Sequence, residues 1–259
     1  MKVHSSAIVS SRVKLGKDVV IGPGTIIDGE VEVGDETEVG PYAVITGNIS
    51  IGRQCRIFTG TVIGSPPQDL KYRGEKGFIR IGDRNTIREY VTINSATEEG
   101  GSTSVGSDNL IMAYSHIAHN CVVADATVLA NNATLAGHVT IEKNVILGGF
   151  CGIHQFCRIG SFAIVGGCSK VTQDVIPYSL SDGRPARVYW LNRIGLKRQK
   201  FSSEALAGLE KAFRLLLRSH LNLTQAVARI KAEVPPAPEV AHLLEFIALS
   251  ERGLALRRC

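Results

Sequence analysis

The chain has 259 residues, of which 44% are hydrophobic, 6% aromatic and 20% charged, and its formal net charge is +5. A chain of this length can bury a large core. It has no apolar run near the ~20 residues that a membrane-spanning helix needs, and its start lacks the apolar segment of a signal peptide. We therefore expect no integral membrane segment and a cytoplasmic location.

An aliphatic residue recurs at every sixth position over most of the chain. The series runs through residues 3–63, keeps its phase over 81–93, and continues over 105–171. A fixed short period is typical of a solenoid, and hexapeptide repeats indicate a parallel β-helix. Three hexads form one coil, so aliphatic residues of successive coils stack at about 4.8 Å inside a prism. The fold prediction is an all-β parallel β-helix over residues 1–190.

Two polar segments interrupt this repeat. Residues 65–78 are charged and contain two prolines, and residues 94–104 are rich in Gly and Ser. Insertions in a solenoid leave its surface as loops, which often carry function. Asp69 and Lys71 place opposite charges in the first loop, where they could fold over a ligand. Counted by their position in the coil, they lie about one face away from the histidines described next.

Four histidines fall at nearly the same position of successive coils, so they are predicted to face outwards along one corner of the prism. A histidine there could take a proton from a hydroxyl during acyl transfer, a contribution of typically ~10²–10⁴-fold. Gly137 leaves a backbone N–H free to approach a developing oxyanion. Asn120, Asn131, Asn132 and Gln155 lie beside the column, whose members are His116, His119, His138 and His154.

Two other interpretations of this column are open. Three imidazoles can hold Zn²⁺ with one open position, but the sequence places no acidic partners near the histidines. A purely structural β-helix would leave the column without a role, and its composition argues against that. The six cysteines, which include Cys259, show no metal-like spacing. We therefore predict an enzyme that has neither a metal nor a bound organic cofactor.

Beyond residue 190 the pattern becomes helical. Ser202 offers a helix start, a second helix is predicted over about 223–234, and a third follows Pro238 and ends before Gly253. Residues 191–259 hold 12 Lys and Arg against 6 Asp and Glu. This predicted C-terminal α-helical domain is therefore basic, which suggests an acidic partner. Nucleic acid is not expected, because no basic stripe with interleaved aromatic residues is present.

Several strings of residues carry a closer resemblance. They are His116-Ile-Ala-His119-Asn, the segment 129–139, Gln68-Asp-Leu-Lys-Tyr and Gly195-Leu-Lys-Arg. Together they resemble the UDP-N-acetylglucosamine O-acyltransferases that open lipid A biosynthesis, and the resemblance covers the whole chain. It implies a left-handed β-helix, a homotrimer with sites between adjacent prisms, and two partners, acyl carrier protein and UDP-N-acetylglucosamine. The implied reaction moves a 3-hydroxyacyl chain from the carrier to the 3-position of the sugar.

The resemblance also implies roles for single residues. His119 matches the general base that deprotonates the sugar 3-hydroxyl, and Gly137 matches the oxyanion donor. Gly167 matches a position in the acyl groove where side-chain size limits chain length, so a fairly long chain is expected. Asp69 and Lys71 match loop residues that reach the substrate from the neighbouring subunit. The other matched substrate-binding positions are His116, His138, His154, Gln155, Asn192 and Arg198.

Four positions depart from the family pattern. Asn120 stands where many relatives have Asp, and Asn94 where many have His. Ile194 replaces a common Glu, and Gln199 replaces a second Arg. These departures weaken the match for the sugar, uridine and phosphate contacts but not for the base and the oxyanion donor. Two alternatives also stay open, namely a UDP 3-amino sugar or another acceptor, and a coenzyme A thioester in place of the acyl carrier protein.

Overall fold

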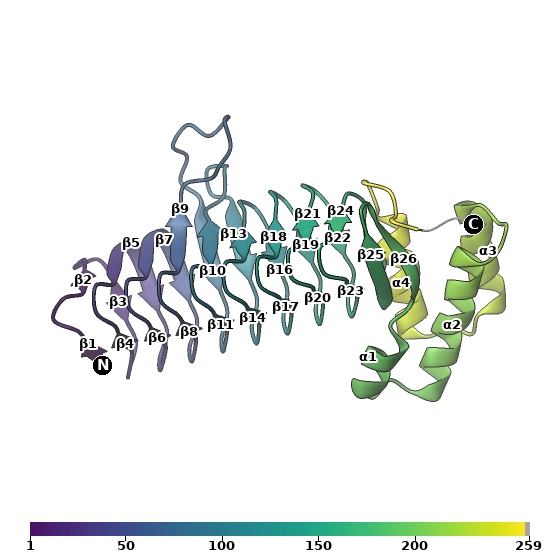
Figure 1. Ribbon diagram of the computed structural model, residues 1–259, viewed down its shortest axis with the longest axis horizontal. Coiled ribbons are helices and arrows are strands. Elements are labelled where there is room, and N and C mark those ends of the chain that lie inside the picture. Colours follow the sequence, from purple (N-terminus) through teal and green to yellow (C-terminus); the bar gives the residue numbers. More distant parts are fainter. Residues whose placement is uncertain (257–259) are drawn as a thin grey trace.

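The computed structural model describes residues 1–256, so Cys259 lies outside the described part of the chain. Figure 1 shows a long prism of stacked coils with the N-terminus at one end and a group of helices at the other. No helix within residues 1–256 is long and apolar enough to cross a membrane. The predicted β-helix of hexapeptide repeats, followed by helices, is confirmed.

The first face of the prism is a sheet of 11 strands, parallel except for its last pair. Its strands follow one another at every coil, so neighbours in the sheet are one coil apart along the chain. In spatial order they are β1 (Lys2–Val3), β4 (Val20–Ile21), β6 (Glu38–Val39), β8 (Arg56–Ile57), β11 (Thr86–Ile87), β14 (Leu110–Ile111), β17 (Val128–Leu129), β20 (Ile146–Leu147), β23 (Ile164–Val165), β25 (Ser179–Gly183) and β26 (Ala186–Leu191).

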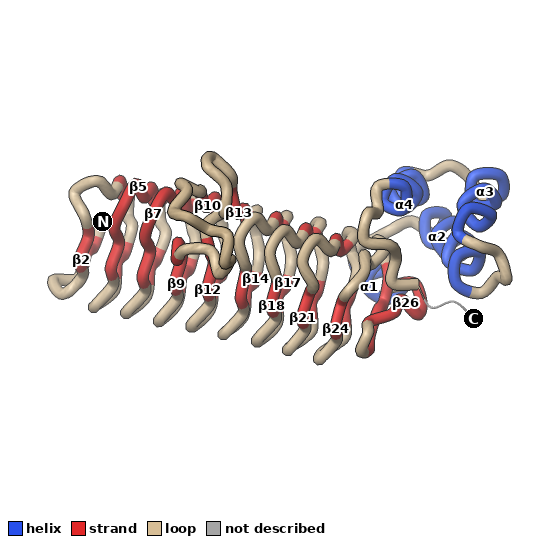
Figure 2. The backbone as a smooth tube through the Cα atoms, turned by 90° about the horizontal axis from the view of Figure 1, so that it is seen from above, coloured by secondary structure: helices blue, strands red, loops and turns tan. Residues whose placement is uncertain are grey.

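The second and third faces form one sheet of 15 strands, because the long strands β5 (Ile26–Val33) and β7 (Val44–Ile51) run through both. The second face also holds β2 (Ile8–Val9), β9 (Val62–Ser65), β12 (Thr92–Asn94), β15 (His116–Ile117), β18 (Thr134–Leu135), β21 (Gly152–Ile153) and β24 (Lys170–Val171). The third face also holds β3 (Lys14–Leu15), β10 (Phe78–Ile81), β13 (Ser102–Val105), β16 (Val122–Val123), β19 (Thr140–Ile141) and β22 (Arg158–Ile159). Figure 2 shows the coils edge-on.

The register of the strands locates the two insertions. Stacked residues are normally 18 apart, as Ser107 and Asp125 are. The separation grows to 30 between Arg53 and Asp83 and to 24 between Arg84 and Asp108. The additional residues form the two loops that leave the prism after β9 and β12, and Figure 1 shows the first of them rising from the prism.

The interior of the prism is a continuous stack of the periodic aliphatic side chains, such as Ile45, Ile63, Ile93 and Ile117, which are fully buried. Burial of each contributes roughly 1.5–3 kcal/mol. At the corners the chain turns through a residue with positive φ, and asparagine, aspartate and aromatic side chains occupy many of these positions. Since these turns stack on one another, the side chains beside them form columns along the corners.

Helices cap the C-terminal end of the prism. They are α1 (Arg193–Arg198), α2 (Ser203–Leu217), α3 (Leu223–Glu233) and α4 (Pro238–Ala248). The predicted Ser202 cap is present, because its hydroxyl accepts from the Ala205 N–H at 3.1 Å. Helix α2 packs against α3, α4 and β26, and it buries Leu209 and Phe213 completely. The antiparallel hairpin β25–β26 joins the prism to these helices.

Candidate active site

The predicted histidine column lies at the corner between the second and third faces. Here the turns at residues 119–120, 137–138 and 155–156 stack directly on one another. The His138 N–H donates to the His119 carbonyl at 3.0 Å, and the Phe156 N–H donates to the Gly137 carbonyl at 3.2 Å. These bonds fix the spacing of the side chains that the corner presents.

Both inserted loops leave the prism at this same corner, because each connects a strand of the second face to a strand of the third. Asp69 and Lys71 therefore lie at the histidine corner, and the expectation that they sit a face away is wrong. The coil count loses its meaning inside an insertion, so it cannot locate them. The position in the coil of Ser65, where the loop begins, already indicates this corner.

A cleft of about 490 Å³ opens between the first loop and the column. The loop that closes it belongs to the same chain, whereas the resemblance implied a loop from a neighbouring subunit. Asp69 and Lys71 thus meet His116 and His119 within one chain. The lining residues are Gln68, Asp69, Leu70, Lys71, His116, Ala118, His119, Thr134, Leu135, Ala136, Gly137 and Gln155.

The ring of His119 is held in one tautomer by Asn120. The Oδ1 atom of Asn120 lies 2.8 Å from His119 Nδ1, and it also accepts from the backbone N–H and the hydroxyl of Thr97, at 3.2 and 3.0 Å. An atom that accepts a bond from a backbone N–H is the amide oxygen, so His119 Nδ1 must carry a proton. His119 Nε2 is then an unprotonated acceptor, as a general base requires.

Gly137 lies against the His119 ring. A Cβ atom at residue 137 would sit 2.3 Å from Cε1 and 2.5 Å from Nε2 of His119, so only glycine fits there. Gly137 is buried, and within residues 1–256 its N–H donates to no protein group. A buried N–H next to His119 Nε2 is thus free to donate to a ligand.

The other two histidines of the corner are disfavoured as carriers of charge. His116 Nδ1 is 2.7 Å from the Thr92 hydroxyl, while the His138 ring lies edge-on to His119 at 5.2 Å and stacks on Phe156 at 4.7 Å. Burial, followed by the positive charge of His119, lowers the pKa of both His116 and His138. Both are therefore held neutral and can act as hydrogen-bond partners for a polar substrate.

Five of the predicted site residues do not line this cleft, namely His138, His154, Gly167, Asn192 and Arg198. His154 is exposed, and its Nδ1 is 3.1 Å from the Gln155 carbonyl and 3.2 Å from Nη2 of Arg252. One nitrogen cannot donate to the first and accept from the second, so the tautomer selects between them. Asn192 and Arg198 line a different cavity, on the first face.

This second cavity has a volume of about 600 Å³ and lies between β17, β20 and β23 of the first face and α1. Asn192 caps α1 there, since its Oδ1 accepts from the Gly195 N–H at 3.1 Å and its Nδ2 donates to the Phe162 carbonyl at 2.9 Å. Arg198 is exposed, and the departures Ile194 and Gln199 line the same cavity. Its walls are mainly apolar.

Gly167 lies between the two cavities, at the corner that joins the first face to the second. It follows β23 and precedes β24, and a Cβ atom there would lie 3.3 Å from the Gly149 carbonyl oxygen. Neither residue has a side chain, so no Cβ atom narrows the corner at these two positions.

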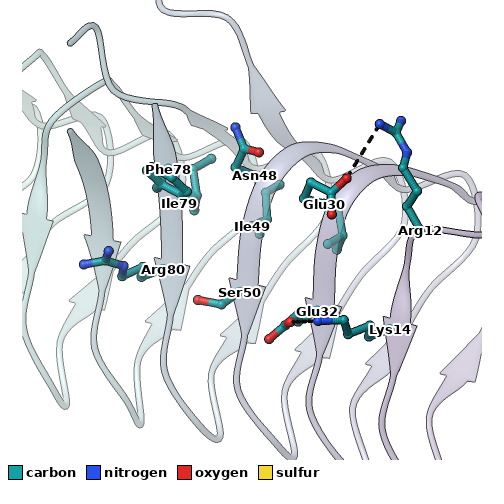
Figure 3. A pocket seen from close by; sticks show the side chains of 11 residues that line it. Arg12, Lys14, Glu30, Glu32, Asn48, Ile49, Ser50, Phe78, Ile79 and Arg80 are labelled. Carbon is teal, nitrogen blue, oxygen red and sulfur yellow. Dashed lines mark hydrogen bonds and ion pairs between the residues drawn. The ribbon is translucent and has the colours of Figure 1, made fainter. Parts of the chain in front are cut away.

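The third face carries a hollow without such chemistry, near the N-terminus. It has a volume of about 360 Å³, and Figure 3 shows that Arg12, which precedes β3, and Lys14 of β3 pair with charged side chains of β5 beside it. Lys14 Nζ is 2.6 Å from Glu32, and Arg12 is 3.7 Å from Glu30. These pairs are exposed and no histidine lines the hollow, so it offers no acid–base pair for catalysis.

Sequence reasoning missed three residues of the corner. Thr97 and Glu98 of the second loop bind the Asn120 amide, and Phe156 stacks on His138. The departure at Asn94 ties the loops together, because its Nδ2 donates to the carbonyls of Ser65 and Pro66 at 3.3 and 3.2 Å. The common corner of the two insertions was the signal that could have found Thr97 and Glu98.

A hexapeptide β-helix that presents the Nε2 of His119 beside a free backbone N–H has groups suited to acyl transfer, and the comparisons with known proteins place the chain among the acyltransferases. Residues 102–137 match the family described as bacterial transferase hexapeptide, and residues 174–255 match the second domain of UDP-N-acetylglucosamine O-acyltransferase. The second match includes the helical end of the chain, whereas the hexapeptide repeat that gives the class its name covers only the prism.

Relatives agree over the full length of the chain. The acyl-[acyl-carrier-protein]–UDP-N-acetylglucosamine O-acyltransferase of Chlorobaculum tepidum is 57% identical and covers 95% of this chain and 94% of its own. That of Trichlorobacter lovleyi is 54% identical, with 98% and 99% covered. The structure of LpxA from Acinetobacter baumannii matches with a TM-score of 0.95 and 39% identity, covering 99% and 100%. The chain belongs to the family of acyl-[acyl-carrier-protein]–UDP-N-acetylglucosamine O-acyltransferases.

Proposed function

We propose that this enzyme transfers a 3-hydroxyacyl chain from acyl carrier protein to the 3-position of UDP-N-acetylglucosamine, as the first step of lipid A biosynthesis, with His119 as general base. One observation carries the mechanism. The bare Nε2 of His119 and the free N–H of Gly137 lie at the same point of one cleft, next to a loop that carries Asp69 and Lys71.

His119 Nε2 takes the proton of the sugar 3-hydroxyl as that oxygen attacks the thioester carbonyl carbon. The oxyanion that forms accepts a hydrogen bond from the Gly137 N–H. When the tetrahedral intermediate collapses, the carbon–sulfur bond breaks and the carrier's thiolate receives the proton from His119. No step needs a covalent enzyme intermediate, a metal or a cofactor.

The binding residues divide between the two cavities. His116, His138 and Gln155 would hold the sugar beside His119, and Lys71 would contact the phosphates opposite Asp69. Asn192 and Arg198 would hold the nucleotide from the first-face cavity, with His154 at the edge of the site. The acyl chain would run along the corner at Gly167.

A homotrimer would bring these two sets together. Within one chain, His119 and Arg198 line cavities on different faces of the prism, so a single substrate molecule cannot be expected to span both. Packing the first face of one prism against the histidine corner of the next would complete the site, and a closed trimer satisfies all three such contacts. The exposed Ile146 of the first face supports this contact.

The basic helical domain supports acyl carrier protein as the donor. Residues 191–259 carry twice as many Lys and Arg as Asp and Glu, and acidic partners are attracted to such a surface. A UDP 3-amino sugar is the second candidate acceptor. A cytoplasmic location fits both substrates.

The test compares the native enzyme with His119→Ala in transfer from 3-hydroxyacyl carrier protein to UDP-N-acetylglucosamine. We expect kcat to fall by roughly 10²–10⁴-fold, with little change in KM. His220→Ala, on the helical domain and away from the cleft, is the matched control. Activity that survives His119→Ala would assign the base to another residue, and native transfer to the 3-amino sugar alone would change the acceptor.

A further inference from the structure

Both the oxygen and the nitrogen of the Asn120 side-chain amide are hydrogen-bonded to the second loop. Its Oδ1 accepts from the N–H and hydroxyl of Thr97, and its Nδ2 donates to the Glu98 carboxylate. If the amide were turned over, its NH₂ would face the Thr97 N–H and its oxygen would face the carboxylate. Both contacts would be repulsive, so the loop allows one orientation of the amide.

The backbone of Asn120 is equally constrained. It adopts a φ of 59°, and its N–H donates to the hydroxyl of the fully buried Thr103 at 2.8 Å. Asparagine tolerates this left-handed conformation better than most residues. The Asn120 oxygen is thus presented to His119 Nδ1 from a rigid position.

Glu98 brings a negative charge to the far side of this amide. Burial raises the pKa of Glu98, but hydrogen bonds from Asn120, its own backbone N–H and Thr97 outweigh that effect and the pKa is lowered. The carboxylate is therefore ionised at neutral pH. Its side chain is exposed, so water and salt screen part of its influence.

We propose that Thr97 and Glu98 are positioning residues, which fix the Asn120 amide and so keep the proton of His119 on Nδ1 and its Nε2 free. Through that amide, Glu98 supplies the negative charge that stabilises the imidazolium formed during transfer. In this chain a neutral Asn120 and a loop carboxylate thus share the task that one adjacent Asp performs in a His–Asp pair. The inference rests on the proposed role of His119 as the base.

Other charged groups face this cluster and enter any pH dependence. His116 and His138 flank His119, while Asp69 and Lys71 face it from the first loop. If His138 were protonated, its charge would lower the pKa of Glu98 as well. Substitutions at Glu98 must therefore be compared with a variant that alters the loop but not this cluster.

Glu99 provides that control. Its carboxylate accepts from the Lys76 N–H at 2.8 Å, in the same pair of loops but away from Asn120. We expect Glu98→Ala to lower kcat about tenfold and to move the acid limb of the kcat/KM profile to lower pH, because the imidazolium loses a favourable charge. Glu98→Gln should keep KM but lose the charge, and Glu99→Ala should match the native enzyme in both respects.

Two further measurements separate positioning from loop stability. In ¹⁵N-histidine spectra the native His119 should show a protonated Nδ1 and a bare Nε2, and Thr97→Ala with Glu98→Ala should populate the other tautomer. The effect of Asn120→Asp on kcat is measured in two backgrounds, the native enzyme and Glu98→Gln. We expect it to be more favourable by at least about fivefold in the Glu98→Gln background, because in the native background the two adjacent carboxylates repel each other.

Either of two results would overturn the inference. One is a Glu98→Ala enzyme with native kcat and an unshifted acid limb. The other is an effect of Asn120→Asp that is the same in both backgrounds. His119→Ala is measured in parallel, because a fully active His119→Ala enzyme would contradict the proposed base, whereas an inactive one with unaffected Glu98 variants contradicts the positioning role alone.

Discussion

The two cavities of this chain differ in what their polar groups already do. At the histidine corner, His119 Nε2 and the Gly137 N–H have fixed positions and are left unused by the protein. In the first-face cavity, the Asn192 side chain already caps helix α1, and the exposed Arg198 lies beside mainly apolar lining residues. Under the proposed function, the first cavity would carry out the chemistry and the second would anchor the nucleotide, so that one chain would hold two halves of a site.

The largest effect on activity should come from Gly137→Ala, which alters the cleft that contains His119. The new methyl would collide with the His119 ring at 2.3 Å and displace it, so we expect kcat to fall about 100-fold or more. Binding of UDP to the other half should persist, as measured by calorimetry. Gly152→Ala is the control, because a Cβ atom there has no other atom within 4 Å. Equal losses in both variants would contradict the special place of Gly137.

A smaller effect is expected at the boundary between the cavities. Gly167→Met would place a side chain at the corner that joins the first face to the second, beside the Gly149 carbonyl at 3.3 Å. We expect kcat/KM for long 3-hydroxyacyl donors to fall about tenfold relative to short ones, with His119 chemistry intact. The measurement is competition between two donors of different length. An unchanged ratio would move the acyl chain elsewhere, and a native preference for a ten-carbon donor would contradict the expected long chain.

The smallest effect concerns one of the contacts between the helical domain and the prism. Glu142 accepts from the Ser161 N–H at 2.8 Å and from His242 Nε2 on α4 at 2.9 Å. Burial raises the pKa of Glu142, but these bonds outweigh it and the pKa lies below the ordinary 4.5. The stabilisation is therefore present above pH 4.5 and is lost as pH falls through the lower folded value.

Glu142→Gln should accordingly cost about 1–2 kcal/mol at neutral pH and progressively less in acid. Chemical denaturation over a series of pH values measures this. Glu32→Gln, which breaks an exposed ion pair, is the control and should change stability little. If the Glu142→Gln enzyme loses UDP binding at a lower denaturant concentration than it loses acyl transfer, the two cavities are separable in stability as well. A loss of stability that does not depend on pH would contradict the predicted pH dependence of the Glu142 contact.

Much of the fold follows from the sequence because hexad spacing is a direct record of burial. Ile63, Ile93 and Ile117 each point inwards at the same place of successive coils, and no other fold explains that regularity. The Ser202 cap and Pro238, which is the first residue of α4, marked helix starts. The hairpin β25–β26 was not predicted, since its residues carry neither the six-residue period nor a helical one.

The site was only partly predictable. The histidines belong to the periodic coils, so their common corner could be counted, and their neighbours in the cleft followed from the resemblance. Thr97 and Glu98 lie in an insertion, where counting fails and contacts depend on how the loop folds back. The placement of His119 and Arg198 in different cavities could not be predicted from the sequence either. It depends on how the hairpin β25–β26 and helix α1 fold onto the first face.

Subunit complementation tests the two-half account most directly. His119→Ala and Arg198→Glu chains are each expected to be nearly inactive alone at limiting UDP-N-acetylglucosamine. When the two are coexpressed and assemble at random, about a quarter of the shared sites receive an intact His119 from one chain and an intact Arg198 from another. We therefore expect about a quarter of native activity. Mixed chains that remain as inactive as the separate variants would show that both residues act within one chain, and would contradict the account.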